Sequence, residues 1–333
     1  MRRLVAELGI THEVERVVDL LCTGAQLGLD RTDQLDLKIS ASALAEMRDA
    51  FLMFAPYDDR PKVTVFGSAR TAPDDPLYVQ TQRLAERFAS AGWMVVTGAG
   101  PGIMLAAMQG AGREASIGVS IRLPFEERPN DVIHDDPKHV SMKYFFTRKL
   151  MLVKESRGFV AVPGGFGTLD ETLELLTLQQ TGKAEPTPIV LLDVPGGTYW
   201  EGFRTFVRDE LASRGLVAAD DLDRVLVTDS VDAALAEVLG FWSIYHSLRW
   251  VGDRLVVRLR HPLADDRIEA LDERFRHCLV DGHIEASGPV GPERSGSDHP
   301  DLPRLVMRWS RPQVGRIHTL IRAINDAGRS SGA

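Results

Sequence analysis

The sequence predicts an α/β fold: a doubly wound, Rossmann-like parallel sheet with an N-terminal helical arm and a small C-terminal α+β domain. Between residues 62 and 239, short runs of apolar and β-branched residues alternate with longer stretches of helical periodicity. This alternation is typical of a parallel sheet that is covered by helices on both faces. Glycine-rich turns follow several of the short runs, and such turns gather where doubly wound sheets bind ligands.

Composition excludes several classes of protein. The chain has 333 residues, 44% of them hydrophobic, which suffices for a sizeable core. Its 39 basic and 47 acidic residues give a net charge of −8, which argues against a dedicated nucleic-acid binder. Cys22 and Cys278 lie far apart, so we expect neither a disulfide framework nor a cysteine metal site. Glu7 interrupts the first apolar run and no run reaches membrane-spanning length, which predicts a cytoplasmic protein with no membrane partner.

Residues 1–58 are predicted to form the helical arm, because their apolar positions recur at three- and four-residue spacing. We expect this arm to pack on the main domain or on a partner subunit, and to end near Pro56 and Pro61. Residues 59–241 are assigned to the main nucleotide-binding domain. Its strands are predicted over residues 63–66, 93–97, 116–121, 159–162, 188–192 and 224–227. Its helices are predicted over residues 78–91, 103–112, 141–156, 169–181, 199–213 and 230–239.

Residues 242–333 are predicted to form a small domain of ββαββα order. Gly252 and Asp253 separate two alternating segments, which indicates a two-residue hairpin turn. A helix over 265–279, a strand over 283–286, a loop over 287–301, a strand over 304–309 and a helix over 314–327 are expected to follow. The spacing of the histidines in this region fits no metal-ligand set. A regulatory ligand and a dimer interface both remain open as its role.

The most informative turn follows the predicted strand 159–162. Three glycines, Gly164, Gly165 and Gly167, precede Thr168 at the predicted start of a helix. Glycines allow close backbone approach, and a helix N-terminus offers free N–H groups, so the turn is predicted to bind phosphate. Glu171 and Glu174 then fall on one helix face near the phosphate. Thr168 and Glu171 also fit a capping box, a purely structural alternative.

Two further glycine turns follow the first and second strands. They hold small residues that we predict to contact a nucleotide: Gly67, Ser68, Gly98, Gly100 and Gly102. Counting from Gly98, the sixth position is Ile103 and not glycine, so the dinucleotide fingerprint is not met. No P-loop motif occurs either. A mononucleotide is therefore the expected ligand.

The segment 141–151 combines cations with aromatic residues on one predicted helix. Met142 and Lys149 are predicted to contact the nucleotide, and Arg148 is predicted to pair with a carboxylate or lie against a base. A solvated basic face or a structural ion pair is the alternative for Arg148.

Taken together, these residues resemble the LOG (Lonely Guy) family, long labelled lysine decarboxylase-like. Its motif P-G-G-x-G-T-x-x-E is complete over residues 163–171, and Arg148, Lys149 and Met151 match an upstream motif. Residues 100–104 match the turn G-P-G-I-M, and residues 123–126 match L-P-F-E. The resemblance covers roughly residues 37 to 239.

The resemblance implies cleavage of a nucleoside 5′-monophosphate into free base and ribose 5-phosphate. It implies a phosphate held by Gly164, Gly165, Gly167 and Thr168, with Arg148 and Glu171 as the catalytic pair. It also implies a homodimer or higher homo-oligomer. No cofactor and no metal are expected for this reaction. Lysine decarboxylation is rejected, because the three lysines of helix 141–156 lack the partners that a pyridoxal cofactor requires.

The sequence departs from the family pattern at Ala99, Leu105 and Met108. The family usually has glycine at the first position, and longer members often have Glu and Asn at the other two. These departures leave the base open: a cytokinin riboside monophosphate or an ordinary purine or pyrimidine monophosphate. Ala99, Leu105 and the extra C-terminal domain also motivate an alternative function, a non-catalytic nucleotide- or cofactor-binding sensor or carrier. An assembly protein with a vestigial site is a third possibility.

Overall fold

The computed structural model describes residues 1–123, 128–294 and 299–329. Within them, seven strands form one parallel sheet in the order β4-β3-β2-β1-β5-β6-β7. The strands are β1 (Lys62–Phe66), β2 (Met94–Thr97), β3 (Ser116–Ile121), β4 (His139–Met142), β5 (Gly158–Ala161), β6 (Ile189–Leu192) and β7 (Val225–Thr228). The predicted doubly wound, Rossmann-like sheet is confirmed.

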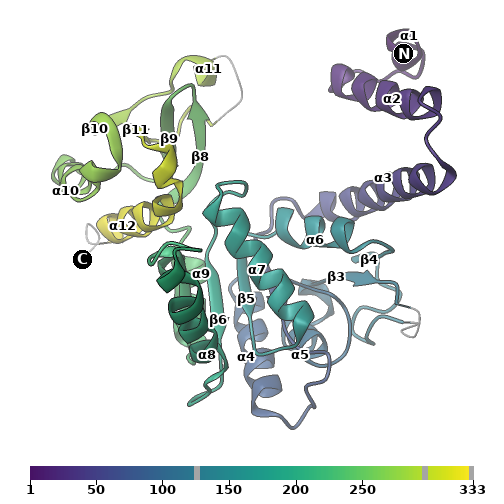
Figure 1. Cartoon of the computed structure of the whole chain (residues 1–333), viewed down its shortest axis with the longest axis horizontal. Coiled ribbons are helices and arrows are strands. Elements are labelled where there is room, and N and C mark those ends of the chain that lie inside the picture. The colour runs from purple at the N-terminus through teal and green to yellow at the C-terminus, as the bar shows by residue number, and fades with distance from the viewer. Residues whose placement is uncertain (124–127, 295–298, 330–333) are drawn as a thin grey trace.

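The N-terminal region is helical, as predicted. It comprises α1 (Arg2–Glu7), α2 (Val14–Leu29) and α3 (Gln34–Phe54). The second half of α3 joins the main core through Ala50 and Phe54, whereas α1 and α2 stand away from the body at the far end of α3 (Figure 1). In the part of the chain that the structure describes, no helix combines the length and apolarity needed to cross a membrane.

Helices cover both faces of the large sheet, which explains why its central strands are buried throughout. The helices of this region are α4 (Pro76–Ser90), α5 (Ile103–Ala111), α6 (Phe145–Lys154), α7 (Phe166–Gln180), α8 (Tyr199–Phe206) and α9 (Val231–Gly240). α3, α6, α7 and α8 share one apolar cluster with the sheet, and α4, α5 and α9 share another. Burial of both faces is the state expected of an all-parallel sheet.

The sheet contains one strand that the sequence analysis did not predict, β4. The predicted helix 141–156 begins instead at Phe145, and Ser141 and Met142 belong to β4. The predicted helix 199–213 is also shorter than expected, because the α-helix ends at Phe206 and continues as a π-helix and a 3-10 turn.

The side of the sheet to which successive strands are added reverses between β1 and β5. After β1 the chain adds β2, β3 and β4 on one side, and then returns through α6 to place β5 on the other side of β1. Ligands of doubly wound folds bind beyond the carboxyl ends of the strands at such a point. The turn after β1 begins at Gly67, and the turn after β5 contains Gly164, so both predicted glycine turns flank it.

The C-terminal region forms a second, antiparallel sheet of order β10-β11-β9-β8. Its elements are β8 (Tyr245–Val251), β9 (Arg254–Leu259), α10 (Asp265–Phe275), β10 (Leu279–Ser287), α11 (Gly291–Arg294), β11 (Arg304–Trp309) and α12 (Ile317–Arg329). The hairpin turn at Gly252 and Asp253 is confirmed. The helix predicted over 265–279 ends earlier than expected, at Phe275, and the helix predicted over 314–327 begins later, at Ile317. The short α11 lies in the predicted loop 287–301, of which residues 295–298 are outside the described residues.

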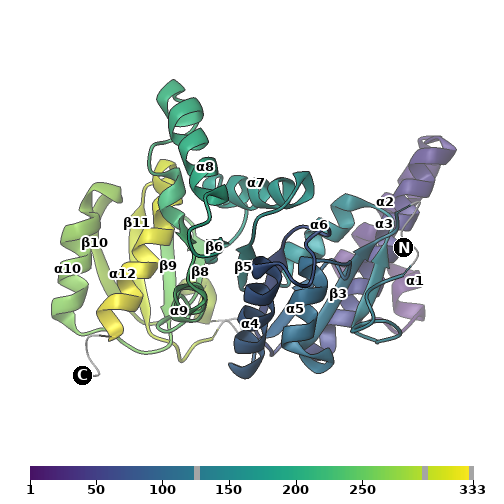
Figure 2. The ribbon, with the colours of Figure 1, turned by 90° about the horizontal axis from the view of Figure 1, so that it is seen from below.

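The second sheet docks on the first domain through α12. His318 is hydrogen-bonded to the carbonyl of Thr187 at 3.1 Å, and Arg322 binds Glu237 at 2.6 Å. Figure 2 shows the second sheet at one end of the molecule and the N-terminal helices at the other.

Candidate active site

A cleft of about 750 Å³ lies at the carboxyl ends of β1 and β5. It is lined by nine of the residues predicted from the sequence: Gly67, Ser68, Gly98, Arg148, Gly164, Gly165, Gly167, Thr168 and Glu171. They come from three glycine turns and from two helices, α6 and α7. The structure therefore brings the predicted phosphate site and the predicted catalytic pair into one cavity.

The glycine turn leads directly into α7. Gly165 is the N-cap residue, and Gly165, Phe166 and Gly167 are exposed at the helix start. The first N–H groups of a helix have no partner within it and carry the positive end of its dipole, which suits a phosphate group. The Tyr199 hydroxyl donates to the Gly164 carbonyl at 2.7 Å and so fixes the turn from α8.

The capping-box alternative for Thr168 and Glu171 is wrong. The helix begins at Phe166, so Thr168 lies inside the first turn. The N-cap residue is Gly165, and no side-chain hydrogen bond caps the helix there. Thr168 is buried against the turn, where a Cβ on Gly164 would overlap its hydroxyl. Glu171 therefore does not cap the helix, and its carboxylate lies near Arg148 instead.

Glu171 faces Arg148 across the cleft. The Nη1 atom of Arg148 lies 3.8 Å from Oε1 of Glu171, and both side chains are largely buried. Oε2 of Glu171 has no hydrogen-bond partner among the residues that the structure describes. Burial raises the pKa of Glu171 to about 7, although Arg148 and Lys149 act in the opposite direction.

Arg148 is oriented by the sheet and by the second glycine turn. Its Nε donates to the Val119 carbonyl of β3 at 3.0 Å. A Cβ on Gly98 would overlap the Nη2 atom of Arg148 and lie 2.8 Å from Sδ of Met104. Glycine is thus required at position 98 to make room for the guanidinium group.

Ala99, one of the departures from the family pattern, has a φ of +59°, a region that favours glycine. Its methyl group packs in a small cluster with Met108 and Ile133, away from the cleft. Met108 is fully buried there, and Leu105 does not line the cleft. The departures at these three positions therefore alter the packing behind the turn and leave the lining of the described cleft unchanged. Residues 124–126 of the L-P-F-E segment lie outside the described residues.

Five predicted nucleotide contacts are not among the residues that line the cleft. Lys149 binds Asp170 at 2.8 Å and Glu174 at 2.9 Å, so it ties α6 to α7. Met142 is buried in β4 within the main core. Gly100 and Gly102 belong to the turn before α5, where a Cβ on Gly102 would overlap the Ser68 carbonyl.

Three residues of functional interest were not predicted. Arg70 lines the cleft beside the first glycine turn and adds a cation, and Tyr199 holds the phosphate turn. Glu46, on α3, is buried and accepts hydrogen bonds from the backbone N–H of Lys143 at 2.7 Å and the Thr147 hydroxyl at 2.8 Å. Glu46 thereby fixes the start of α6, the helix that carries Arg148.

Comparison with known proteins supplies relatives for the region that forms this cleft. The family described as "Possible lysine decarboxylase" matches residues 102–238. A "Cytokinin riboside 5'-monophosphate phosphoribohydrolase" of Mycobacterium marinum is 30% identical over 187 residues, which are 55% of this chain and 97% of that protein. A protein of the same name from Mycobacterium tuberculosis is 29% identical over 167 residues, covering 48% of this chain and 86% of that protein.

Among solved structures, the molybdenum cofactor carrier protein of Chlamydomonas reinhardtii is 28% identical to this chain, with a TM-score of 0.37. The match covers 54% of this chain and 96% of that protein. The family match ends at residue 238, before the second sheet begins.

Proposed function

The chain belongs to the LOG (Lonely Guy) family, and from that membership we propose that it hydrolyses the N-glycosidic bond of a nucleoside 5′-monophosphate. The products are the free base and ribose 5-phosphate. The observation that carries the proposal is the position of the buried Glu171–Arg148 pair in the same cleft as the exposed N-terminus of α7.

The geometry suits a ribose 5′-phosphate. In the proposed complex, the N–H groups at Gly165, Phe166 and Gly167 bind the phosphate, with Arg70 nearby. Glu171 follows Gly167 by four residues, just over one helical turn or about 6 Å along the axis. A sugar whose phosphate sits at the helix start therefore places its anomeric carbon near the carboxylate.

Glu171 supplies the chemistry. Departure of the base leaves positive charge on the ribose ring, which a nearby carboxylate stabilises. The ionised carboxylate also orients the attacking water and accepts its proton, while the water oxygen bonds to C1′ and the C1′–N bond breaks. The electron pair of the broken bond stays on the base nitrogen, which takes up a proton from solvent, and Glu171 returns its proton to solvent. With a pKa of about 7, the Glu171 carboxylate is well matched to this proton transfer at neutral pH. Arg148 holds the carboxylate in place and lies where the departing base gains electrons.

The relatives are named for cytokinin riboside monophosphates, and the same cleft chemistry serves ordinary purine and pyrimidine monophosphates. The test is to incubate the purified chain with a panel of both kinds and to measure free base. Release from at least one monophosphate supports the proposal, and the preferred substrate identifies the base. No release from any of them at high enzyme concentration would overturn it.

We further propose that the active protein is a homodimer in the reducing cytoplasm, where Cys22 and Cys278 remain free thiols. Apolar side chains are exposed along α6 and α7, and Phe166 is 92% exposed at the mouth of the cleft. A second copy of the chain would cover them. Light scattering on the parent and on Leu173→Glu tests this: the parent should be a dimer and the variant a monomer.

A further inference from the structure

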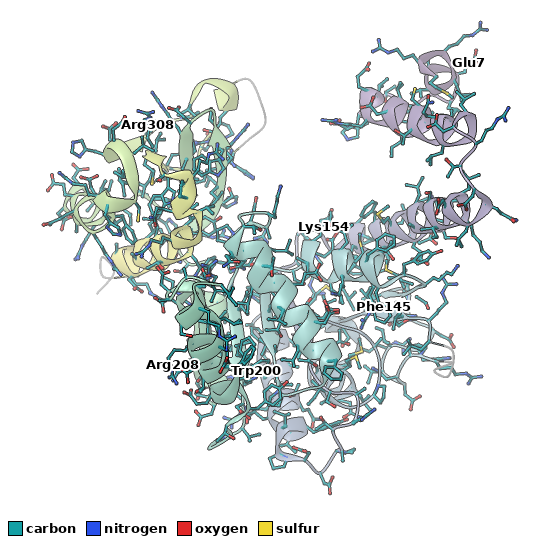
Figure 3. All side chains as sticks on the ribbon, viewed as in Figure 1. Glu7, Phe145, Lys154, Trp200, Arg208 and Arg308 are labelled. Atoms are coloured by element: carbon teal, nitrogen blue, oxygen red, sulfur yellow. The ribbon has the colours of Figure 1, made fainter. Side chains whose placement is uncertain are left out.

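A pocket of about 340 Å³ lies where the C-terminal region packs on the main domain. One wall comes from the end of α7, from the loop over residues 182–186 and from Arg224, and the other comes from β8 and the start of α12. Small-molecule sites usually have volumes of about 300 to 1,000 Å³ and often lie between domains. Figure 3 labels Trp200 on the main domain and Arg308 on the second sheet, and this interdomain pocket lies at the junction of these two parts.

The wall of the interdomain pocket contains the buried side-chain amide of Gln179. Its Nε2 donates to the Thr187 carbonyl and hydroxyl, both at 2.8 Å. Since only the nitrogen of an amide can donate to a carbonyl, these bonds fix which way the amide points. Oε1 of Gln179 is left as an acceptor, and it has no hydrogen-bond partner in the part of the chain that the structure describes.

His318, on α12, supplies a second acceptor to the same pocket. Its Nε2 lies 3.1 Å from the Thr187 carbonyl, to which it can only donate. Burial lowers the pKa of His318 to about 3, so the ring is neutral and Nδ1 carries a lone pair and no proton. Nδ1 has no hydrogen-bond partner within residues 1–123, 128–294 and 299–329. One carbonyl therefore orients two buried side chains, each with an unused acceptor.

Arg224 supplies donors to the pocket. It is buried, its Nη2 donates to Asp221 at 2.6 Å, and a Cβ on Gly315 would lie 2.7 Å from that nitrogen. Nε and Nη1 of Arg224 have no hydrogen-bond partner among the described residues. Buried polar atoms are nearly always paired, so four unpaired atoms on three residues around one pocket indicate a polar guest.

The unpaired atoms define what the guest must offer. An anion without N–H or O–H groups would leave both acceptors unpaired and would face their lone pairs. A simple cation would face the guanidinium group of Arg224 and offer it no acceptor. The guest therefore combines donors and acceptors in one neutral molecule. Leu248, Trp250 and Ile317 add apolar and aromatic walls, which favour a flat ring.

We propose that the interdomain pocket binds a free nucleobase, a neutral heterocycle that carries N–H donors together with carbonyl or ring-nitrogen acceptors. Its N–H groups pair with Gln179 and His318, and its acceptors pair with Arg224. The described residues that line this pocket include none of those that line the candidate active site. His318 and Trp250 lie beyond residue 238, where the family match ends, so the matched family region does not contain the whole site.

Hypoxanthine is a suitable probe, because it carries N–H donors at two ring nitrogens besides a carbonyl and further ring-nitrogen acceptors. Its derivative 1,9-dimethylhypoxanthine keeps the acceptors and lacks both donors. Isothermal titration calorimetry on the full chain should show hypoxanthine binding. The dimethyl derivative should bind about tenfold more weakly or less well still, because it leaves the buried acceptors of Gln179 and His318 unpaired.

Two variants locate the site. Gln179→Leu removes one acceptor, and Val314→Trp fills the pocket from a half-buried position without removing a buried polar group. Each should weaken hypoxanthine binding by about tenfold or more. The matched control is Val280→Trp, at an exposed position on β10, which should bind like the parent. Melting temperatures show which variants are folded, and Val314→Trp still decides the question if Gln179→Leu does not fold.

Absence of hypoxanthine binding to the parent would mean that ordered water alone satisfies these atoms, and it would overturn the proposal. Equal affinities for hypoxanthine and 1,9-dimethylhypoxanthine, or unchanged binding in the folded variants, would overturn it as well. The titration contains no nucleoside monophosphate and counts binding, not turnover. Its outcome is therefore independent of the proposed hydrolysis.

Discussion

Nη1 of Arg148 lies 3.8 Å from Oε1 of Glu171, although the two residues come from different helices that flank the same strand, β5. At this distance the guanidinium group attracts the carboxylate without forming a short hydrogen bond. Burial outweighs that attraction and raises the pKa of Glu171 to about 7. The carboxyl group is therefore poised between its two protonation states at neutral pH, which is a property of catalytic acids and bases.

The pH dependence of turnover follows from this pair. Because the ionised form of Glu171 stabilises the ribosyl cation and accepts the proton, kcat/KM should rise with pH and level off above an apparent pKa near 7. Arg148→Gln removes the cation that favours the ionised form, so its residual activity should rise at a higher pH than that of the parent. A pH profile of both proteins checks this. A profile of the parent that is flat from about pH 5 to 8 would contradict it.

The stability of the protein should depend on the same carboxyl group. The pKa of Glu171 is higher in the folded protein than in the unfolded chain, so the folded state favours the protonated carboxyl group. The free energy of unfolding therefore falls as pH rises through about 7. Glu171→Gln removes the buried charge and should stabilise the protein at pH 8 by roughly 1 to 3 kcal/mol, with a smaller effect at pH 5. Urea unfolding at the two pH values measures the difference. Equal effects at both would show that the charge is not the cause.

Gly98→Ala should displace Arg148. The new methyl group would overlap Nη2 of Arg148, so the guanidinium group must move away from Glu171. We expect kcat to fall on the order of ten- to a hundredfold, because catalytic groups lose effect when misplaced by an ångström. Gly202→Ala on α8, where the added methyl meets no atom within 4 Å, is the matched control and should keep full activity. Equal activity of the two variants would refute the role of Gly98.

Glu46→Gln should disturb the active site from a distance. The Glu46 carboxylate accepts from Lys143 N, Thr147 Oγ1 and Arg122 Nη2, and so fixes the start of the helix that carries Arg148. Loss of these charge-assisted bonds should cost about 1 to 3 kcal/mol of stability and lower kcat more than it raises KM. The exposed Glu86→Gln on α4 serves as the control. Unaltered kcat in a destabilised Glu46→Gln protein would leave Glu46 with a structural role only.

Features that are local in sequence were predictable. The glycine turns, the helix that follows them and the alternation of strands and helices are determined by neighbouring residues, and the structure confirms them. β4 was missed because it has only four residues, of which two are polar, and it lies at the edge of the sheet. The start of α7 was placed three residues late, because the extended Gly165 and not Thr168 is the N-cap.

Contacts between distant segments were not predictable from the sequence. Glu46 reaches Thr147 across 101 positions of the chain, and Tyr199 reaches Gly164 across 35. Arg148 and Glu171 were paired through the family resemblance, whereas the burial that raises the pKa of Glu171 depends on how α6 and α7 pack on the sheet.

The most direct test of the account is to quantify free base and ribose 5-phosphate together, in the parent and in Glu171→Gln, on the monophosphate that the panel identifies. We predict equal amounts of both products from the parent, and at least a hundredfold slower release from Glu171→Gln, on the order expected when a catalytic carboxylate is removed. Nucleotide binding should be retained in the variant. Binding without turnover in the parent, or full turnover in Glu171→Gln, would contradict the account, and the former would favour a nucleotide carrier.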